Sequence, residues 1–268
     1  MTEVSDMDII QRHIALKINY LERLIRQMPD VSTFTRINKN SVSTKVRVHR
    51  NGTTLYTAGA KTQKGQASLL SGELKQKYLA ELNSLHSYWH SKWREPVPKL
   101  VRKSTADGPS VRSPLLSLEN YLRAEPYCNL AYPIRNGILL NDKMYRSKGE
   151  IKVAGNLSSL GLEFKYETML DAGGHGVFPD FFARSVEINN CAYVEYCGML
   201  DDPNYYNQYI MKRQLYHNMG LREGVDVVFI NEFRDINVSD DWIKLLILHA
   251  LEFDAKFEEQ PMQFRTRL

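Results

Sequence analysis

The sequence predicts an α/β fold in which an α+β-like mixed sheet is flanked by helices. Helix and strand patterns alternate in the C-terminal part, and they follow the order helix, three strands, helix, strand, helix. Three strands in succession form a meander, and a crossover helix then allows a further strand to join the sheet. The predicted elements are helix 147–160, strands 163–170, 180–188 and 191–197, helix 203–218, strand 225–231 and helix 239–255.

The N-terminal part predicts a helix, a hairpin and a second helix. Residues 6–28 carry apolar residues at near-helical spacing, and residues 69–93 do the same. Between them, residues 43–60 alternate around Asn51-Gly52, which is a strong hairpin signal because both turn residues accept a positive φ. Residues 1–94 are therefore expected to form a basic α+β region of helix-hairpin-helix type, which could bind DNA.

Residues 95–115 contain four prolines and few residues suited to a core. We expect this segment to be a linker, or else an extended segment that docks on nucleic acid. The C-terminal domain then covers 116–268 and starts with a short helix near 116–124.

Composition excludes several classes of protein. The 268 residues include 43% hydrophobic and 25% charged residues, which is ordinary for a soluble globular protein. Three scattered cysteines argue against a disulfide framework and a zinc cluster. No apolar signal region and no long apolar stretch is present, so we expect a cytoplasmic protein without membrane contact.

Charge is distributed unevenly along the chain. Residues 1–114 hold 19 Lys and Arg against 9 Asp and Glu, a net charge of +10, whereas residues 115–268 hold 16 against 22, a net charge of −6. A basic part that grips phosphates beside an acidic part that binds metal fits this division, and so does a merely soluble basic surface.

Two carboxylates are predicted to share one face of the sheet. If Asn189-Asn190 is a two-residue turn, Ile188 faces Cys191, Glu195 lies opposite Arg184, and Cys197 lies opposite Phe182. Since alternate residues of a strand point the same way, Asp180, Glu195 and Cys197 then lie on one face. Carboxylate oxygens at such a point suit Mg²⁺ or Mn²⁺.

Residues 145–233 resemble the PD-(D/E)XK, or restriction-endonuclease-like, nuclease superfamily. The resemblance rests on Glu150 in Ser147-Lys148-Gly149-Glu150, Asp180 in Pro179-Asp180 and Glu195 in Val194-Glu195-Tyr196-Cys197-Gly198. It implies that Glu150, Asp180 and Glu195 are catalytic metal ligands for Mg²⁺ or Mn²⁺, which would activate water and stabilise charge on a phosphate.

The chain departs from that family at one position. A lysine is expected two residues after Glu195, but Cys197 stands there. Lys212 on the next helix is our preferred substitute, because it shares a helical stripe with Tyr216, a candidate accessory residue. RecB-like relatives carry Q-x-x-x-Y on the corresponding helix, and this chain has Lys212-x-x-x-Tyr216.

Each candidate also has a structural interpretation. Glu150 completes a capping box with Ser147, Asp180 suits a turn, and Lys212 suits a solvated helix face. Glu195 lies on a largely apolar strand, where a carboxylate needs a metal or a cation as partner. Cys197 suits a small packed apolar side chain.

Two further accessory candidates lie near the acids. Glu167 is either an accessory acid beside the metal ligands or a surface position on the first strand. His175 belongs to a glycine-rich segment that is either a loop closing over substrate or a plain turn.

Basic residues gather on the N-terminal hairpin and just after it. They are predicted to bind nucleic acid through phosphate contacts, as a strand ribbon can, although a basic hairpin packed between two helices is the alternative. The residues are Lys45, Arg47, Arg50, Lys61 and Lys64.

These observations predict a Mg²⁺- or Mn²⁺-dependent endonuclease or exonuclease that hydrolyses phosphodiester bonds, in DNA first and RNA second. A homodimer would be natural for cleavage of both strands. The alternative is a catalytically inactive nucleic-acid-binding or partner-binding module that keeps the nuclease fold, which the missing lysine favours.

Overall fold

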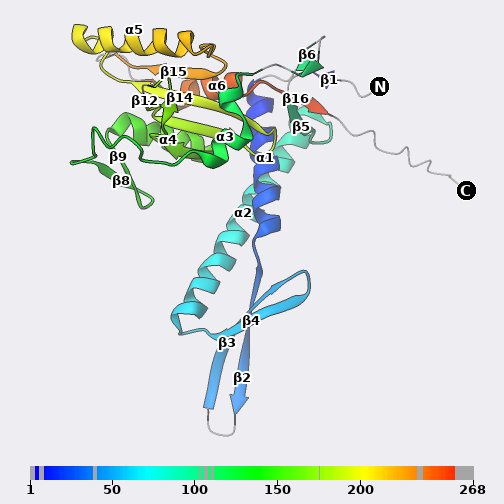
Figure 1. The fold of residues 1–268 in the computed structure, drawn as a ribbon. Helices are drawn as coiled ribbons and strands as arrows, with labels where there is room; N and C mark the ends of the chain where they lie inside the picture. The colour runs from blue at the N-terminus through cyan, green and yellow to red at the C-terminus, as the bar shows by residue number, and fades with distance from the viewer. Residues whose placement is uncertain are drawn as a thin grey trace, which may run out of the picture. The chain divides into compact units, whose positions relative to one another are not determined.

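A computed structural model describes residues 4–5, 9–38, 41–102, 104–105, 108–109, 112–174, 176–233 and 238–256 (Figure 1). Two compact units divide the chain: residues 17–97 form one, and residues 1–16 with 98–268 form the other. Within the residues described, no helix has both the length and the apolar character needed to cross a membrane.

The larger unit is built on a four-stranded mixed sheet, which confirms a mixed α/β fold. The strand order is β10-β13-β14-β15; the first three strands are antiparallel, and β15 is parallel to β14. The strands are β10 (Glu163–Tyr166), β13 (Phe181–Ser185), β14 (Asn190–Cys197) and β15 (Val227–Asn231).

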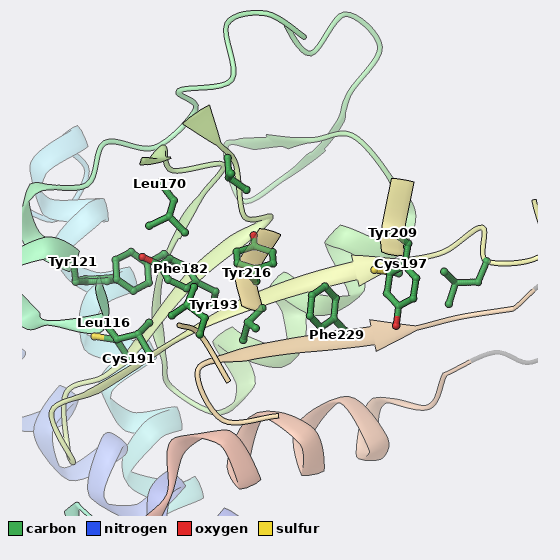
Figure 2. Close-up of a cluster of buried hydrophobic side chains, with 14 residues drawn as sticks. Leu116, Tyr121, Leu170, Phe182, Cys191, Tyr193, Cys197, Tyr209, Tyr216 and Phe229 are labelled. Atoms are coloured by element: carbon green, nitrogen blue, oxygen red, sulfur yellow. The ribbon is translucent and has the colours of Figure 1, made fainter. Parts of the chain in front are cut away.

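Helices cover both faces of this sheet. Tyr193 and Cys197 of β14 belong to an apolar cluster with Tyr209 and Tyr216 of α5 (Figure 2). Tyr196, which points to the opposite face, lies against Gly149 of α4. Helices α3 and α5 therefore lie on one face, and α4 with its neighbour α6 lies on the other. The helices are α3 (Leu118–Arg123), α4 (Lys148–Ser159), α5 (Pro203–Asn218) and α6 (Asp240–Leu251).

The predicted register between the second and third strands is wrong. Ser185 pairs with Asn190, so the connection spans residues 186–189 and Asn189 takes a positive φ of 48°. Arg184 consequently faces Cys191, and Phe181 faces Val194. The partner of each β14 residue moves by four positions, an even number, which preserves the face on which each side chain lies. It also brings Asp180, one residue before Phe181, beside Glu195.

The segment 95–115 enters the larger unit from residue 98 onward. Strand β5 (Lys99–Arg102) pairs with β16 (Phe253–Lys256), which also pairs with β1 (Val4–Ser5). Arg112 is buried and donates to the carbonyls of Cys191 and Val225, each at 2.9 Å. From residue 98 onward, this segment is therefore built into the larger unit rather than being a plain tether.

Several short elements complete the larger unit. They are β6 (Ser104–Thr105), β7 (Gly108–Pro109), η1 (Pro114–Leu116), β8 (Ile138–Leu140), β9 (Lys143–Tyr145), β11 (Leu170–Asp171) and β12 (Gly176–Val177).

The smaller unit contains the predicted hairpin and one strand that was not predicted. Asn51 and Gly52 have φ of 50° and 77° and join β3 to β4, which confirms the turn. The additional strand, β2, pairs with β3 along its whole length. The elements are α1 (Ile9–Gln27), within which the division between units falls, β2 (Asp30–Asn38), β3 (Ser41–Arg50), β4 (Thr53–Gly59) and α2 (Gln63–Trp93).

Gly149 provides a test of how α4 meets the sheet. A Cβ at Gly149 would come within 1.9 Å of the Tyr196 ring, whereas a Cβ at Gly155 of the same helix would meet nothing within 4 Å. We expect Gly149→Ala to lower the free energy of unfolding by about 1–3 kcal/mol or more through overpacking. Gly155→Ala should be neutral or stabilising by up to about 1 kcal/mol. Denaturant unfolding of both variants checks this, and equal stabilities would contradict the packing described.

Candidate functional site

A polar pocket of about 200 Å³ lies where β13 begins and β14 ends. All of the catalytic acids predicted from the sequence line it, and the predicted lysine lines it as well. The lining residues are Glu150, Asp180, Glu195, Tyr196, Cys197, Tyr205, Gln208, Tyr209 and Lys212.

Glu195 is the most deeply buried of these acids. Its residue is 1% exposed, and one carboxylate oxygen accepts a hydrogen bond from Lys212 Nζ at 2.6 Å. The other oxygen accepts from the hydroxyl of Tyr216. The carboxylate that was expected to need a metal or a cation partner therefore has a cation partner and a neutral donor, both from α5.

Asp180 lies beside Glu195, in the turn between Pro179 and β13. Its Oδ2 accepts from the backbone amide of Tyr196 at 2.7 Å. Burial raises the pKa of the Asp180 carboxyl well above its usual range, and the neighbouring charge of Glu195 raises it further. Lys212 opposes this effect only in part. The adjacent carboxylates of Asp180 and Glu195 therefore create a negative potential that favours binding of a cation.

Lys212 remains protonated in this setting. Burial lowers the pKa of its ammonium group, but the charges of Glu195 and Asp180 and the hydrogen bond to Glu195 raise it more, so the pKa is raised overall. Its side chain is 32% exposed and lines the pocket, while its ammonium group is bonded to Glu195.

Glu150 comes from α4, on the other face of the sheet. Its amide donates to Ser147 Oγ at 3.1 Å, which confirms that Ser147 caps the helix. Its carboxylate accepts from the Tyr166 hydroxyl at 2.6 Å and from the backbone amide of Arg146 at 2.8 Å. Burial and then the charge of Asp180 raise the pKa of Glu150. The residue thus serves the helix start and lines the pocket.

Glu167 is not a surface strand position. Strand β10 ends at Tyr166, and Glu167 is 5% exposed with a positive φ of 49°. Arg146 donates to the Glu167 carboxylate through Nε at 2.5 Å and Nη2 at 3.1 Å. The backbone amide of Glu167 donates to the carbonyl of Asp180 at 3.1 Å. Glu167 thus fixes the backbone that carries Asp180.

Cys197 is a packed apolar residue, as the sequence suggested. It is buried within the α5 side of the core, and burial raises the pKa of its thiol, which stays neutral (Figure 2). The other cysteines, Cys128 and Cys191, are also free thiols. His175 lies outside the residues that the structure describes.

Sequence reasoning missed three residues of this region. Tyr196 lies over Gly149 and Gly198, and its hydroxyl donates to Glu232. Gln208 lines the pocket from α5, and Arg146 holds Glu167. The two glycines that flank the Tyr196 ring are the signal that could have indicated a close approach, because a side chain is excluded at both positions.

The predicted nucleic-acid contacts lie in the smaller unit. Lys45 and Arg47 share one face of β3, and the Arg47 guanidinium stands 4.7 Å from the centre of the Phe34 ring. Lys61 is exposed, and Lys64 lies 3.9 Å from the centre of the Tyr56 ring. Arg50 lies at the far end of β3 and donates to the carbonyl of Gln27 at 2.6 Å.

The pocket offers oxygen ligands for a divalent cation. Asp180 and Glu195 are adjacent carboxylates, and after burial the charge of Glu195 is the next largest cause of the raised pKa of Asp180. Over the described part of the chain, no three His, Cys, Asp or Glu side chains are already gathered as a metal site. The carboxylate chemistry fits Mg²⁺ or Mn²⁺, and Glu150 on the opposite wall supplies a further oxygen.

No family model, no curated protein and no solved structure matches this chain.

The raised pKa of Asp180 predicts that the ionised Asp180 carboxylate lowers the stability of the fold at neutral pH. The native state binds the Asp180 proton more tightly than the unfolded chain, in which the pKa is about 3.9. The stability from this proton is complete below about pH 4 and is lost as the pH rises through the native pKa. Asp180→Asn should therefore raise the Tm by a few degrees at pH 7, and this gain should disappear near pH 3.5.

Thermal unfolding at both pH values checks this, with Glu163→Gln as control. Glu163 is a carboxylate of the same sheet, but its side chain is 46% exposed and pairs with Arg184. The control should change the Tm little at either pH. A Tm for Asp180→Asn that equals the parent at pH 7 would contradict the description of Asp180.

Proposed function

We propose that this protein is a divalent-metal-dependent nuclease of the restriction-endonuclease-like type. The observation that carries the proposal is the contact between Lys212 and Glu195 beside Asp180. The ammonium group is 2.6 Å from the Glu195 carboxylate, so a lysine from α5 occupies the region that Cys197 leaves without a charge. An acid pair that can hold a metal ion, with an ammonium group beside it to stabilise negative charge, suits phosphodiester hydrolysis.

The order of elements supports the same proposal. The strands of the main sheet and the helices α4 and α5 follow in the order α4, β10, β13, β14, α5 and β15, with the short strands β11 and β12 between β10 and β13. The first three sheet strands form an antiparallel meander, and β15 joins parallel to β14. Glu150 lies on the first helix of that series, Asp180 at the start of the second strand, and Glu195 near the end of the third. This is the arrangement that the resemblance to PD-(D/E)XK nucleases implies for its acidic residues.

Each residue of the pocket has a role in the proposed reaction. Asp180 and Glu195 hold the metal ion, and Glu150 assists as a ligand or through water. When bound, Mg²⁺ or Mn²⁺ supplies an activated water and charge stabilisation at the phosphate. Lys212 stabilises negative charge on the phosphate with its ammonium group. Tyr216 orients the Glu195 carboxylate by donating its hydroxyl hydrogen.

The proposed substrate is DNA, with RNA as the second choice. The basic residues Lys45, Arg47, Lys61 and Lys64 of the smaller unit would contact phosphates, while Arg50 has its guanidinium bonded to Gln27. A homodimer would allow both strands of a duplex to be cut. Three free cysteines are consistent with a reducing, cytoplasmic setting.

A second candidate is a nucleic-acid-binding module without activity. The observation that favours it is that Lys212 already neutralises Glu195, so the pocket is partly self-compensated. In that case the ion pair would be a structural element of the core.

Cleavage assays separate the two candidates. Plasmid and oligonucleotide substrates with Mg²⁺ or Mn²⁺ should be cut by the parent protein. Asp180→Asn and Glu195→Gln should reduce kcat by about 100-fold or more, because metal activation contributes several kcal/mol. Lys212→Met should reduce kcat by about 100- to 1000-fold, the loss typical of one removed electrostatic donor.

Lys165→Met is the matched control for Lys212. Lys165 belongs to the same sheet, but its ammonium group donates to the carbonyls of Leu122 and Ala124 at 3.1 and 2.6 Å. Its kcat should stay within about threefold of the parent if the variant is folded. Cleavage that survives both acid substitutions would rule out the metal assignment. Salt-dependent binding without any cleavage would establish the inactive module.

Metal binding has a readout that does not depend on cleavage. A ligand that binds only the native state raises stability, by about 2.7 kcal/mol at a concentration 100 times its Kd. Mn²⁺ should therefore raise the Tm of the parent protein, and it should have little effect on Asp180→Asn or Glu195→Gln. Glu163→Gln should respond like the parent. An equal Tm shift in all four proteins would show that Mn²⁺ binds elsewhere.

A further inference from the structure

The β2–β3 hairpin extends beyond the rest of its sheet (Figure 1). Strand β4 pairs with β3 only from Lys45 to Arg50, whereas β2 pairs with β3 from Ser41 onward. Residues 35–38 and 41–44 therefore form a two-stranded ribbon, which we call the β-ribbon. The sequence that surrounds it is strongly basic, because residues 31–72 contain seven Lys and Arg and no Asp or Glu.

The two faces of the β-ribbon differ in chemistry. On one face, Ile37 pairs with Val42 and Thr35 pairs with Thr44. Ile37 is 76% exposed and Val42 is 71% exposed, so this apolar pair is presented to solvent at the end of the hairpin. Arg36 extends from the other face, which continues along the hairpin to Lys45 and Arg47.

We propose that the β-ribbon enters the major groove of duplex DNA. A two-stranded ribbon has the width that this groove admits. The apolar and hydroxyl side chains of one face would meet base edges and thymine methyl groups, and the long basic side chains of the other would reach the phosphates beside the groove. The inference rests on the proposed function for its premise that nucleic acid is the substrate, and it deepens that function by naming duplex DNA.

The aromatic residues of this sheet favour a duplex over a single strand. Single-stranded nucleic acid is typically bound by stacking its bases on open aromatic rings. The Phe, Tyr and Trp residues within β2, β3 and β4 are Phe34 and Tyr56. Arg47 stands over the Phe34 ring and Lys64 over the Tyr56 ring. Both rings of the described sheet thus already carry a cation where a base would stack.

Charge decides between DNA and a second copy of the chain as occupant. An exposed strand edge can pair with the same edge of another copy. Here that pairing would bring two acid-free basic segments together, and their mutual repulsion would oppose it. A polyanion has the complementary charge.

Binding of labelled duplex DNA tests the proposal in the full chain carrying Asp180→Asn, with EDTA present to prevent cleavage. Fluorescence anisotropy is measured across a series of salt concentrations. Arg36→Ala and Lys45→Ala should each weaken binding and reduce the salt slope by about one, because each removes a phosphate contact. The double variant Ile37→Ser, Val42→Ser should weaken duplex binding about 5- to 10-fold with the salt slope unchanged.

Two matched controls lie on α2. Leu70→Ser removes a side chain that is 65% exposed, and Lys92→Ala removes one exposed charge from the last turn of the helix. Both should bind like the parent. Because Ile37 and Val42 are exposed, their substitution should leave the Tm unchanged, which thermal unfolding verifies. A single strand of the same length should bind more weakly than the duplex.

Three outcomes would overturn the proposal. The first is a double variant that binds duplex DNA like the parent, and the second is a single strand that binds as tightly as the duplex. The third is loss of self-association in the double variant, measured by light scattering, which would identify a second copy as the occupant. These results are independent of catalysis, because absence of cleavage with ribbon-dependent binding would refute the nuclease and leave the duplex-binding ribbon intact.

Discussion

The site depends on one buried carboxylate and the cation that compensates it. Glu195 is almost fully excluded from solvent on a strand flanked by partners on both sides, so its charge must be balanced within the fold. Lys212 and Tyr216 provide that balance from one side of α5, since they are four residues apart on the helix. This requirement fixes how α5 lies on the sheet. The apolar residues around it, including Tyr209 and Phe229, then pack in the same alignment.

The site also requires acidic residues from both faces of the sheet to come together at one end of it. Glu150 arrives from the α4 face and Glu195 from the α5 face, and Asp180 lies between them where β13 begins. The Tyr196 ring packs on Gly149, so α4 approaches the sheet more closely than any residue with a side chain would allow. Glu167 and Arg146 hold the backbone behind Asp180. Glu150 and Glu195 are therefore placed by a helix and a strand, and Asp180 is held by hydrogen bonds to its backbone and carboxylate, which suits a pre-organised site.

Much of this arrangement could be predicted from the sequence, for identifiable reasons. The hairpin at Asn51-Gly52 follows from local turn chemistry, the placement of Asp180 and Glu195 on one face follows from strand alternation, and Glu150 came from the family resemblance. The predicted register around Asn189 was wrong because Asn189-Asn190 suits a two-residue turn, whereas the actual connection covers residues 186–189. The sequence alone does not distinguish these two connections. The prediction still assigned each β14 side chain to the correct face of the sheet, because the register differs by four positions, an even number. Strand β2 was missed because its pairing with β3 is a tertiary choice that its own exposed, mixed residues do not indicate. The pairing of Arg146 with Glu167 was missed because the two residues are 21 positions apart and no local pattern joins them.

The central claim is that Asp180 and Glu195 form a cation site beside Lys212. Crystals of the parent protein soaked in Mn²⁺ provide the most direct test, because anomalous scattering locates the ion without reference to activity. The claim predicts a single strong peak within bonding distance of the Asp180 and Glu195 carboxylates, with the Lys212 ammonium group beside it. A pocket without a peak at millimolar Mn²⁺, with the Lys212–Glu195 ion pair intact, would contradict it.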